Sequence, residues 1–339
     1  MNGEARRPLV EAREVTKLYY ASPGLQATGG RHGYVRALDR VSLTVYPGET
    51  VGLVGESGCG KSTLGRVLIR LEAPTEGQIV FDGEDITRLR GARLRKRRRE
   101  MQIIFQDPAS SLNPRLRVRT ALEEAVRTHR GRITPRQMNA HLGALLDMVG
   151  LPVEALGRLP REFSVGERQR ISIARALAVE PRFLVADEPL SALDMASRTQ
   201  LSSLLASLQR ELGVALLLIT HNVELVGQMS HRIAVMYLGR VVELAPAEDL
   251  LKTPRHPYTR ALLASVLTRE PGAFRSPAVL PGDPPSPLEP PKGCHFHPRC
   301  PCAEMPCRLI VPLTHEVSPG HLSMCHFDFE GDAKVAPRP

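Results

Sequence analysis

The residues with the clearest chemical capacity form a glycine-rich run. The run Gly55-Glu56-Ser57-Gly58-Cys59-Gly60-Lys61-Ser62-Thr63 contains the pattern G-x-x-x-x-G-K-[ST], between an expected strand and a helical run. In such a loop the backbone N–H groups surround nucleotide phosphates at a helix N-terminus. We therefore expect these residues to bind ATP, with Lys61 neutralising the β- and γ-phosphates and the Ser62 hydroxyl ligating Mg²⁺.

Two adjacent carboxylates end a second apolar strand pattern, Phe183-Leu184-Val185-Ala186-Asp187-Glu188. Taken alone, this pattern fits a buried strand that ends in an acidic turn. With a phosphate loop upstream it matches a Walker B segment. In that interpretation Asp187 holds Mg²⁺, mostly through water, and Glu188 polarises the attacking water. Together the two motifs predict nucleotide hydrolysis.

The net charge of +9 is concentrated in one place. Eight basic residues and no acidic one lie between Arg88 and Arg99, so the rest of the 339-residue chain is close to neutral. Because aromatic residues make up 4% and tryptophan is absent, we expect no nucleic-acid partner but a basic face toward anionic headgroups. No apolar stretch is long enough to span a membrane, and no secretion signal is present, so a cytoplasmic protein is predicted.

The distribution of strand and helix patterns predicts an α/β domain with a largely parallel sheet. Strand signals stop between 109 and 166, where apolar residues recur at helical spacing. We expect the domain over 9–268, with a helical subdomain inserted over about 108–168. Region 269–339 is expected to hold a proline-rich linker and a cysteine cluster. The expected strands are 51–54, 102–105, 183–186, 214–219 and 232–237.

Five of the six cysteines lie in the last 46 residues. In a reducing compartment such clustering points to metal or iron–sulfur ligation before disulfides. The five are Cys294, Cys300, Cys302, Cys307 and Cys325, and histidines lie beside them. Four thiolates suit an iron–sulfur cluster and tetrahedral Zn²⁺ equally, so a cluster, zinc and reduced thiols without metal all remain open.

Further motifs around these two resemble those of ATP-binding-cassette (ABC) proteins over about residues 10–267. They stand in that family's order and spacing. They comprise a signature sequence at Glu162-Phe163-Ser164-Val165-Gly166-Glu167-Arg168-Gln169-Arg170, a glutamine loop at Phe105-Gln106-Asp107-Pro108, a D-loop at Ser191-Ala192-Leu193-Asp194, a switch histidine at Ile219-Thr220-His221, and an adenine-stacking aromatic residue at Tyr19.

The resemblance implies a fold and a set of roles. The fold is a RecA-like α/β core with an antiparallel β part and a helical subdomain, followed here by a short irregular segment that contains the cysteines. Glu188, His221 and Gln106 would be catalytic: Gln106 would contact Mg²⁺ and the attacking water, and His221 the γ-phosphate. The signature and Asp194 would contact the ATP held by a partner cassette.

Three longer segments narrow the resemblance to the ATPase subunits of oligopeptide and dipeptide ABC importers, of the F-type. They are FQDPASSLNPR at 105–115, VMYLGRVVE at 235–243 and HPYTRALL at 256–263, and the cysteine tail is similar as well. The resemblance implies a motor subunit at the cytoplasmic face of the membrane. Its partners would be a second ATPase, two permease subunits and, indirectly, an extracytoplasmic solute-binding protein. The resemblance also implies that the tail holds a [4Fe–4S] cluster through the regular pattern Cys294-x5-Cys300-x6-Cys307-x17-Cys325, in which Cys302 has no assigned role. Two alternatives stay open: the same machinery importing nickel chelates, glutathione or oligosaccharides, or a soluble ABC ATPase.

The signature departs from the family's usual Ser-Gly-Gly-Gln. Here it reads Ser164-Val165-Gly166-Glu167. Val165 adds a β-branched side chain where backbone must approach phosphate, and Glu167 adds negative charge near a triphosphate. Because this loop would cap the partner's ATP, two interpretations stay open: the partner's site is impaired, or Ser164 and Gly166 suffice.

Overall fold

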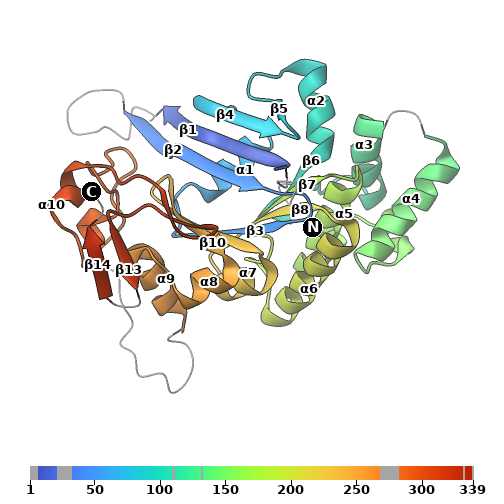
Figure 1. Ribbon diagram of the computed structural model, residues 1–339. Coiled ribbons are helices and arrows are strands. Elements are labelled where there is room, and N and C mark those ends of the chain that lie inside the picture. The colour runs from blue at the N-terminus through green and yellow to red at the C-terminus, as the bar shows by residue number, and fades with distance from the viewer. Residues whose placement is uncertain are drawn as a thin grey trace, which may run out of the picture.

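The computed structural model describes residues 7–20, 33–108, 111–130, 133–267, 282–330 and 333–337. Its centre is an eight-stranded sheet in the order β11-β12-β10-β9-β3-β8-β7-β6. An antiparallel four-stranded sheet in the order β2-β1-β4-β5 lies above it, and helices cover the opposite side (Figure 1). This is the α/β fold class that the sequence predicts.

The parallel half of the central sheet contains all five strands expected from the sequence. They lie within one residue of the expected bounds: β3 (Thr50–Val54), β6 (Met101–Ile104), β7 (Phe183–Asp187), β8 (Ala215–Ile219) and β9 (Arg232–Tyr237). Their continuous apolar runs match a sheet that is covered on both faces. In β8, Leu217 packs into the core under the antiparallel sheet, while Leu216 and Leu218 pack into the core under the helices.

The antiparallel sheet and helix α1 close one side of this core. Alternating burial along β2 puts every second residue against the core, as expected for a sheet with one wet face. The first helix, α1, lies between the two sheets (Figure 1). The bounds are β1 (Val10–Tyr20), β2 (Tyr34–Val45), β4 (Glu76–Phe81), β5 (Glu84–Asp85) and α1 (Lys61–Leu68).

Helices occupy the interval in which the sequence shows no strand signal. A capping box starts α4, in which the Thr134 side chain accepts a hydrogen bond from the backbone N–H of Gln137. Leu142, Leu145 and Leu146 then form its buried face, at the predicted helical spacing. The elements here are α3 (Val118–Arg130), α4 (Pro135–Met148), η2 (Val153–Gly157), η3 (Pro160–Glu162) and α5 (Val165–Leu177), and α6 (Met195–Leu212) and α7 (Val223–Met229) follow β7 and β8.

The C-terminal region that holds the cysteine cluster (269–339), called the cysteine region below, contains regular elements that the sequence did not predict. Strand β12 (His321–Ser323) pairs with β10 (Arg240–Pro246), and β11 (His315–Ser318) pairs with β12, so this region extends the central sheet. The buried Glu243 carboxylate of β10 fixes this junction, because His321 Nε2 lies 2.7 Å from Glu243 Oε1. Helices α8 (Ala247–Lys252) and α9 (Pro257–Leu267) precede the cysteine region. That region also contains η4 (His297–Arg299), α10 (Met305–Leu309), β13 (Phe327–Glu330) and β14 (Ala333–Pro337).

The predicted proline-rich linker lies outside the described residues up to 281, and its second part, 282–293, contains no helix or strand. Among the residues that are described, no helix has both the length and the apolar character needed to cross a membrane.

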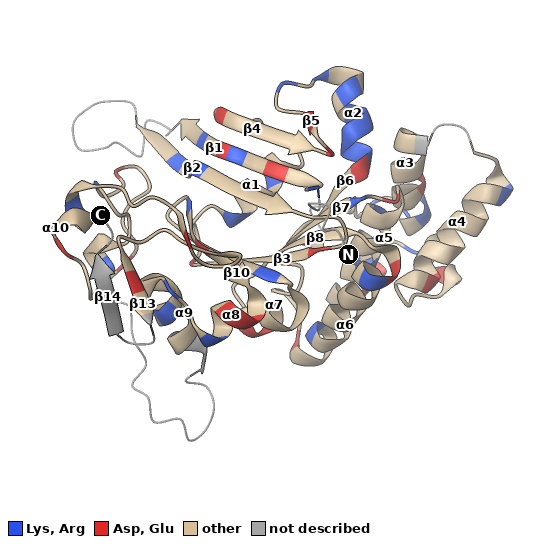
Figure 2. Ribbon diagram, viewed as in Figure 1, with Lys and Arg blue, Asp and Glu red and all other residues tan. Residues whose placement is uncertain are grey.

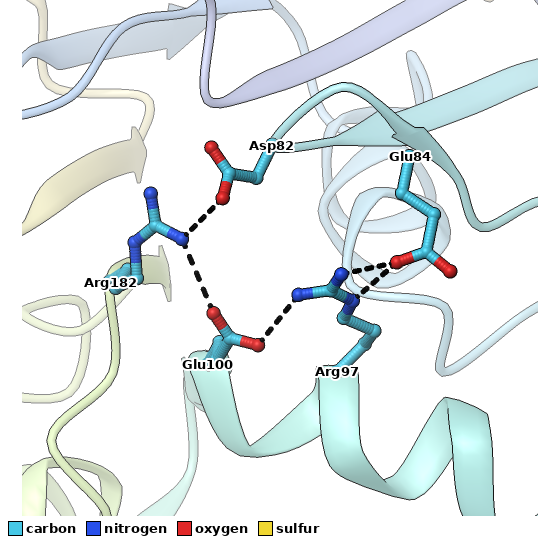
Figure 3. Close-up of polar contacts among 5 residues, drawn as sticks. All are labelled: Asp82, Glu84, Arg97, Glu100 and Arg182. Carbon is cyan, nitrogen blue, oxygen red and sulfur yellow. Dashed lines mark hydrogen bonds and ion pairs between the residues drawn. The ribbon is translucent and has the colours of Figure 1, made fainter.

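The basic run forms helix α2 (Gly91–Glu100), which stands beside the antiparallel sheet (Figure 2). Arg97 bonds both Glu84 and Glu100, and Arg182 bonds Glu100 at 3.3 Å and Asp82 at 2.8 Å (Figure 3). Each pair is partly exposed and individually weak. Together they join the β4–β5 turn, α2 and the residue before β7, and so hold the helix in one place.

Candidate functional site: a phosphate loop and three converging side chains

The phosphate loop connects the end of β3 to the start of α1, as predicted. Gly55 and Gly60 both have positive φ values, 151° and 108°. A Cβ atom at Gly55 would lie 2.2 Å from the Met236 carbonyl oxygen, and one at Gly60 would lie 2.3 Å from that of Ala37. Only glycine fits at these two positions, because both the backbone angle and the neighbouring backbone exclude a side chain.

Lys61 lies beneath this loop with its side chain buried. Its ammonium group donates to the carbonyl oxygens of Gly55 and Glu56, each at 2.9 Å. The loop thus holds a positive charge at its centre, at the N-terminus of α1. Loop, lysine and helix dipole together form a site suited to phosphate.

Ser62 and Asp187 meet although 125 positions separate them in the chain. The Ser62 hydroxyl donates to Asp187 Oδ1 at 2.8 Å. Burial is the main cause that raises the pKa of Asp187, and the Ser62 hydrogen bond opposes it. A hydroxyl and a carboxylate oxygen side by side are ligands that Mg²⁺ accepts, so these residues fit the ion that the family implies.

Glu188 is the centre of a second group. Gln106 Nε2 lies 3.4 Å from Glu188 Oε2, and His221 Nδ1 lies 3.5 Å from the same oxygen. The three residues follow β6, β7 and β8, whose carboxyl ends meet at one edge of the sheet. Glu188 has a φ of 46°, and its N–H donates to the Ile219 carbonyl at 2.9 Å. A non-glycine residue held in this region is strained, which is typical of functional sites.

Tyr19 lies close to the phosphate loop but already has polar neighbours. Its hydroxyl donates to a Glu72 carboxylate oxygen. Lys17 Nζ lies 5.0 Å from the centre of the Tyr19 ring. Burial is the main cause that raises the Tyr19 pKa, and a hydrogen bond with Thr63 opposes the rise. The assignment of Tyr19 to adenine stacking stays a prediction.

The signature forms the N-terminus of α5. Ser164 is its N-cap, and Glu167 closes a capping box in which its Oε2 lies 2.8 Å from both the Ser164 nitrogen and hydroxyl oxygen. These two hydrogen bonds are the main causes that lower the Glu167 pKa. The carboxylate therefore stays charged, directly beside the serine hydroxyl.

The D-loop lies against the signature. Asp194 caps α6 by accepting a hydrogen bond from the Ser197 backbone N–H at 2.9 Å. A Cβ built on Gly166 would be 3.6 Å from Ser197 Oγ. The two predicted partner-facing elements are therefore neighbours in this chain.

The structure brings all four predicted cysteine ligands together. Cys294, Cys300, Cys307 and Cys325 line one cavity of about 10 Å³, which Cys302 also lines. Burial raises the pKa of Cys300 and of Cys325 to about 12. The thiols of Cys300 and Cys325 are therefore neutral, and they pack against apolar side chains.

This arrangement is not a ready-made metal site. Within the described part of the chain, no group of three or more His, Cys, Asp or Glu side chains is placed to hold a metal ion. A cavity of about 10 Å³ holds no more than one water molecule. An inserted metal group would require the thiols to move apart. The geometry therefore adds no support for zinc or for an iron–sulfur cluster.

Sequence reasoning missed two residues that touch the phosphate loop. Arg299 forms two hydrogen bonds with the Glu56 carboxylate, and the Tyr258 hydroxyl accepts one from the Glu56 backbone N–H. Both lie in segments that resemble the peptide-importer ATPases. No local pattern connects them with Glu56, which lies more than 200 positions away.

Comparison with known proteins identifies the family of this site. A family profile described as "ABC transporter" matches residues 38–191. The "Oligopeptide transport ATP-binding protein AppF" of Bacillus subtilis is 46% identical over 329 residues, which cover 96% of this chain and 99% of that protein. This chain belongs to the ATP-binding subunits of ABC transporters. The resemblance seen in the sequence is thereby confirmed.

Other matches cover the C-terminal part of this ABC subunit and the fold of its cassette. A profile described as "Oligopeptide/dipeptide transporter, C-terminal region" matches residues 242–307, which include Tyr258, Arg299 and three of the four predicted cysteine ligands. A "Probable peptide ABC transporter ATP-binding protein" of Sinorhizobium fredii is 46% identical over 94% of this chain and 89% of that protein. A solved dimeric ABC cassette, in a post-hydrolysis state with ADP and phosphate, covers 70% of this chain and 98% of that chain, with a TM-score of 0.62 and 29% identity.

Proposed function

We propose that this ABC subunit is the ATP-hydrolysing motor of an importer for oligopeptides or dipeptides. The observation that carries the hydrolytic role is the convergence of Gln106, Glu188 and His221 beside the phosphate loop. The Gln106 amide nitrogen and His221 Nδ1 both lie within 3.5 Å of one Glu188 oxygen. The cargo class rests on the relatives, whose names describe peptide and oligopeptide transport.

Each group has a distinct task in this reaction. Lys61 and the loop N–H groups bind the β- and γ-phosphates. Glu188 accepts the proton of the attacking water, while Gln106 and His221 hold that water and the γ-phosphate in line. Ser62 and Asp187 would hold Mg²⁺, which when bound neutralises charge on the phosphate oxygens. Asp187 would then act as a ligand and leave Glu188 free as the base.

We propose that the motor works as a heterodimer with a second ABC ATPase. In that assembly each signature caps the ATP bound by the other chain, and hydrolysis removes contacts that favour the closed state. Here Ser164, Gly166 and Asp194 would face the partner's ATP, together with the charged Glu167 carboxylate. The two ATP sites would then differ. The site on this chain's own phosphate loop has all of this chain's phosphate-binding and catalytic residues, whereas the departures in the signature would affect the partner's site.

The permease subunits would dock between α2 and α3. A cavity of about 450 Å³ opens there, and its lining combines Leu71, Leu94 and Ile103 with Arg95 and His129. Apolar walls with a cationic rim suit a short helix that carries acidic residues. In this placement the exposed basic residues of α2 face anionic headgroups, at the cytoplasmic face of the membrane. A solute-binding protein would deliver peptide from the other side.

The cysteine cavity belongs to the same proposal. Each thiolate of a [4Fe–4S] cluster binds a different iron, so a cluster needs four cysteines around a space and not around a point. Cys294, Cys300, Cys307 and Cys325 line one cavity, but a cluster would require the thiols to move apart. The proposal of a cluster in place of zinc therefore rests on the similarity of this four-cysteine tail to that of the peptide-importer ATPases. The cluster would have a structural task, because hydrolysis needs no electron transfer.

The test is reconstitution of the complete importer in proteoliposomes. We expect ATP hydrolysis that rises when peptide-loaded solute-binding protein is added, and peptide that accumulates inside. A complex with Glu188→Gln in this chain should bind ATP but accumulate no peptide. Hydrolysis at the same rate with and without the solute-binding protein would reject the transport role. Stimulation by a solute other than a peptide would reject peptides as the cargo.

A further inference from the structure

The phosphate loop rests on side chains from two segments that take no part in hydrolysis. The Tyr258 hydroxyl, at the start of α9, accepts a hydrogen bond from the Glu56 N–H at 2.9 Å. The Tyr258 ring is fully buried, 4.7 Å from the Tyr237 ring centre and 5.4 Å from that of Phe296. An aromatic cluster thus joins α9, β9 and the cysteine region directly behind the loop.

Arg299 adds a charged contact to the same loop residue. Its Nη1 and Nη2 donate to the two Glu56 carboxylate oxygens at 2.8 and 3.0 Å. The Arg299 side chain is only 6% exposed, and its guanidinium lies 5.9 Å from the centre of the Tyr237 ring. A bidentate pair of this kind fixes orientation as well as distance.

Glu56 is thereby held through all of its polar groups. Tyr258 holds the backbone N–H, Arg299 holds the carboxylate, and Lys61 donates to the carbonyl oxygen at 2.9 Å. Because Glu56 is the second residue of the phosphate loop, its orientation sets where the loop carbonyls and Lys61 lie. The contact that orients it comes from the turn between Cys294 and Cys300.

We propose that Arg299, supported by Tyr258, is a positioning residue for ATP binding, and that the cysteine region is part of the nucleotide site through Arg299 and Glu56. The inference deepens the proposed ATPase function and rests on it. Arg299 does not contact the nucleotide; it holds Glu56, and Glu56 holds the loop. Loss of the pair lets the loop sample other conformations, so ATP binding has to restore the competent one.

The test is a double-mutant cycle on the full-length chain, with Mg·ATP binding measured by calorimetry. Arg299→Met and Glu56→Gln should each weaken ATP binding about tenfold, the effect of losing one charge-assisted contact. The double variant should bind as each single variant does, because the two residues act as one unit. Arg308→Met, which removes an exposed arginine of the same region, should bind ATP like the wild type.

A second readout separates positioning from mere stability. In the assembled ATPase, Arg299→Met should raise the KM for ATP and leave kcat within about twofold, since Arg299 touches no reacting atom. Arg299→Lys keeps the charge but loses the bidentate geometry, so its KM for ATP should lie between that of the wild type and that of Arg299→Met. A lowered melting temperature with unchanged ATP affinity, or additive losses in the double variant, would overturn the proposal.

The inference and the proposed function fail in different ways. Wild-type chain that binds no ATP would reject the function. Wild-type chain that binds ATP, with binding weakened in Lys61→Ala but unchanged in Arg299→Met, would reject the inference alone.

Discussion

Glu188 carries the sharpest prediction at the scale of single residues. Glu188→Gln removes the carboxylate that accepts a proton from water but keeps the shape of the side chain. We expect turnover in the assembled transporter to fall about 10²- to 10⁴-fold, with ATP affinity kept. Single-turnover hydrolysis together with ATP binding measures both quantities. A wild-type rate in this variant would show that another group is the base.

Lys61→Ala should give the opposite pattern. Lys61 is the charge at the centre of the phosphate loop, and its ammonium already orders two loop carbonyls. Its loss should weaken ATP binding about tenfold to a hundredfold, the effect of one charge-assisted contact to phosphate. Calorimetric titration of the isolated chain with Mg·ATP checks this. Binding of wild-type strength would contradict the role of Lys61.

Most of the site residues could be predicted because their signals are local. The phosphate loop and the two carboxylates at the carboxyl end of β7 are contiguous motifs, and the carboxyl ends of parallel strands bring them together. Contacts such as that of Arg299 with Glu56 could not be predicted, because the two residues are 243 positions apart and no pattern around either one indicates the other. Such a contact depends on how the C-terminal region folds back.

The signature shows what an element can do that its separate residues do not. Glu167 departs from the usual sequence, yet it forms a regular capping box and so stabilises the start of α5. The same bonds hold its charge beside Ser164, where the γ-phosphate of the partner's ATP would approach. If the signature caps the partner's ATP as proposed, the stability of the helix and the affinity for phosphate would therefore be opposed at this N-terminus.

Restoring the signature tests this opposition. The double change Val165→Gly and Glu167→Gln should raise hydrolysis at the ATP site on the partner's phosphate loop and leave the other site unchanged. Turnover is measured in two complexes, each with one phosphate-loop lysine replaced, so that one site reports at a time. If the two sites of the unrepaired complex already turn over equally, the departures are tolerated and the sites are not asymmetric.

Short elements explain why the C-terminal region was harder to predict than the core. The strands of the parallel sheet are largely apolar runs of four to six residues, and the sequence predicts all five. By contrast, β11 and β12 are runs of four and three residues that are rich in polar side chains, and their pairing depends on the buried Glu243 contact with His321. A run of three residues has no usable periodicity, so only the folded chain reveals that this region extends the central sheet.

At the scale of the whole molecule, the cysteine region links parts that lie far apart in the chain. It extends the central sheet at β12, supports the phosphate loop through Arg299, and encloses its own small cavity. Its own buried cluster is small, with Phe327, Phe329 and Cys307 at its centre. A region with so little apolar content gains stability from cross-links, for which metal ligation by thiolates is one means.

The last prediction concerns these cross-links. Protein purified without oxygen should carry four irons per chain and absorb at about 400 nm, as thiolate-bound iron–sulfur clusters do. Cys325→Ser should lose the iron, because Cys325 belongs to the regular four-cysteine pattern. Cys302→Ser is the matched control: it lines the same cavity but stands outside that pattern, and should keep the iron. Colourless protein with one zinc per chain would reject the cluster, and protein without any metal would reject both forms of ligation. Because Arg299 immediately precedes Cys300, loss of the iron in Cys325→Ser should also weaken ATP binding, which the same calorimetric titration measures.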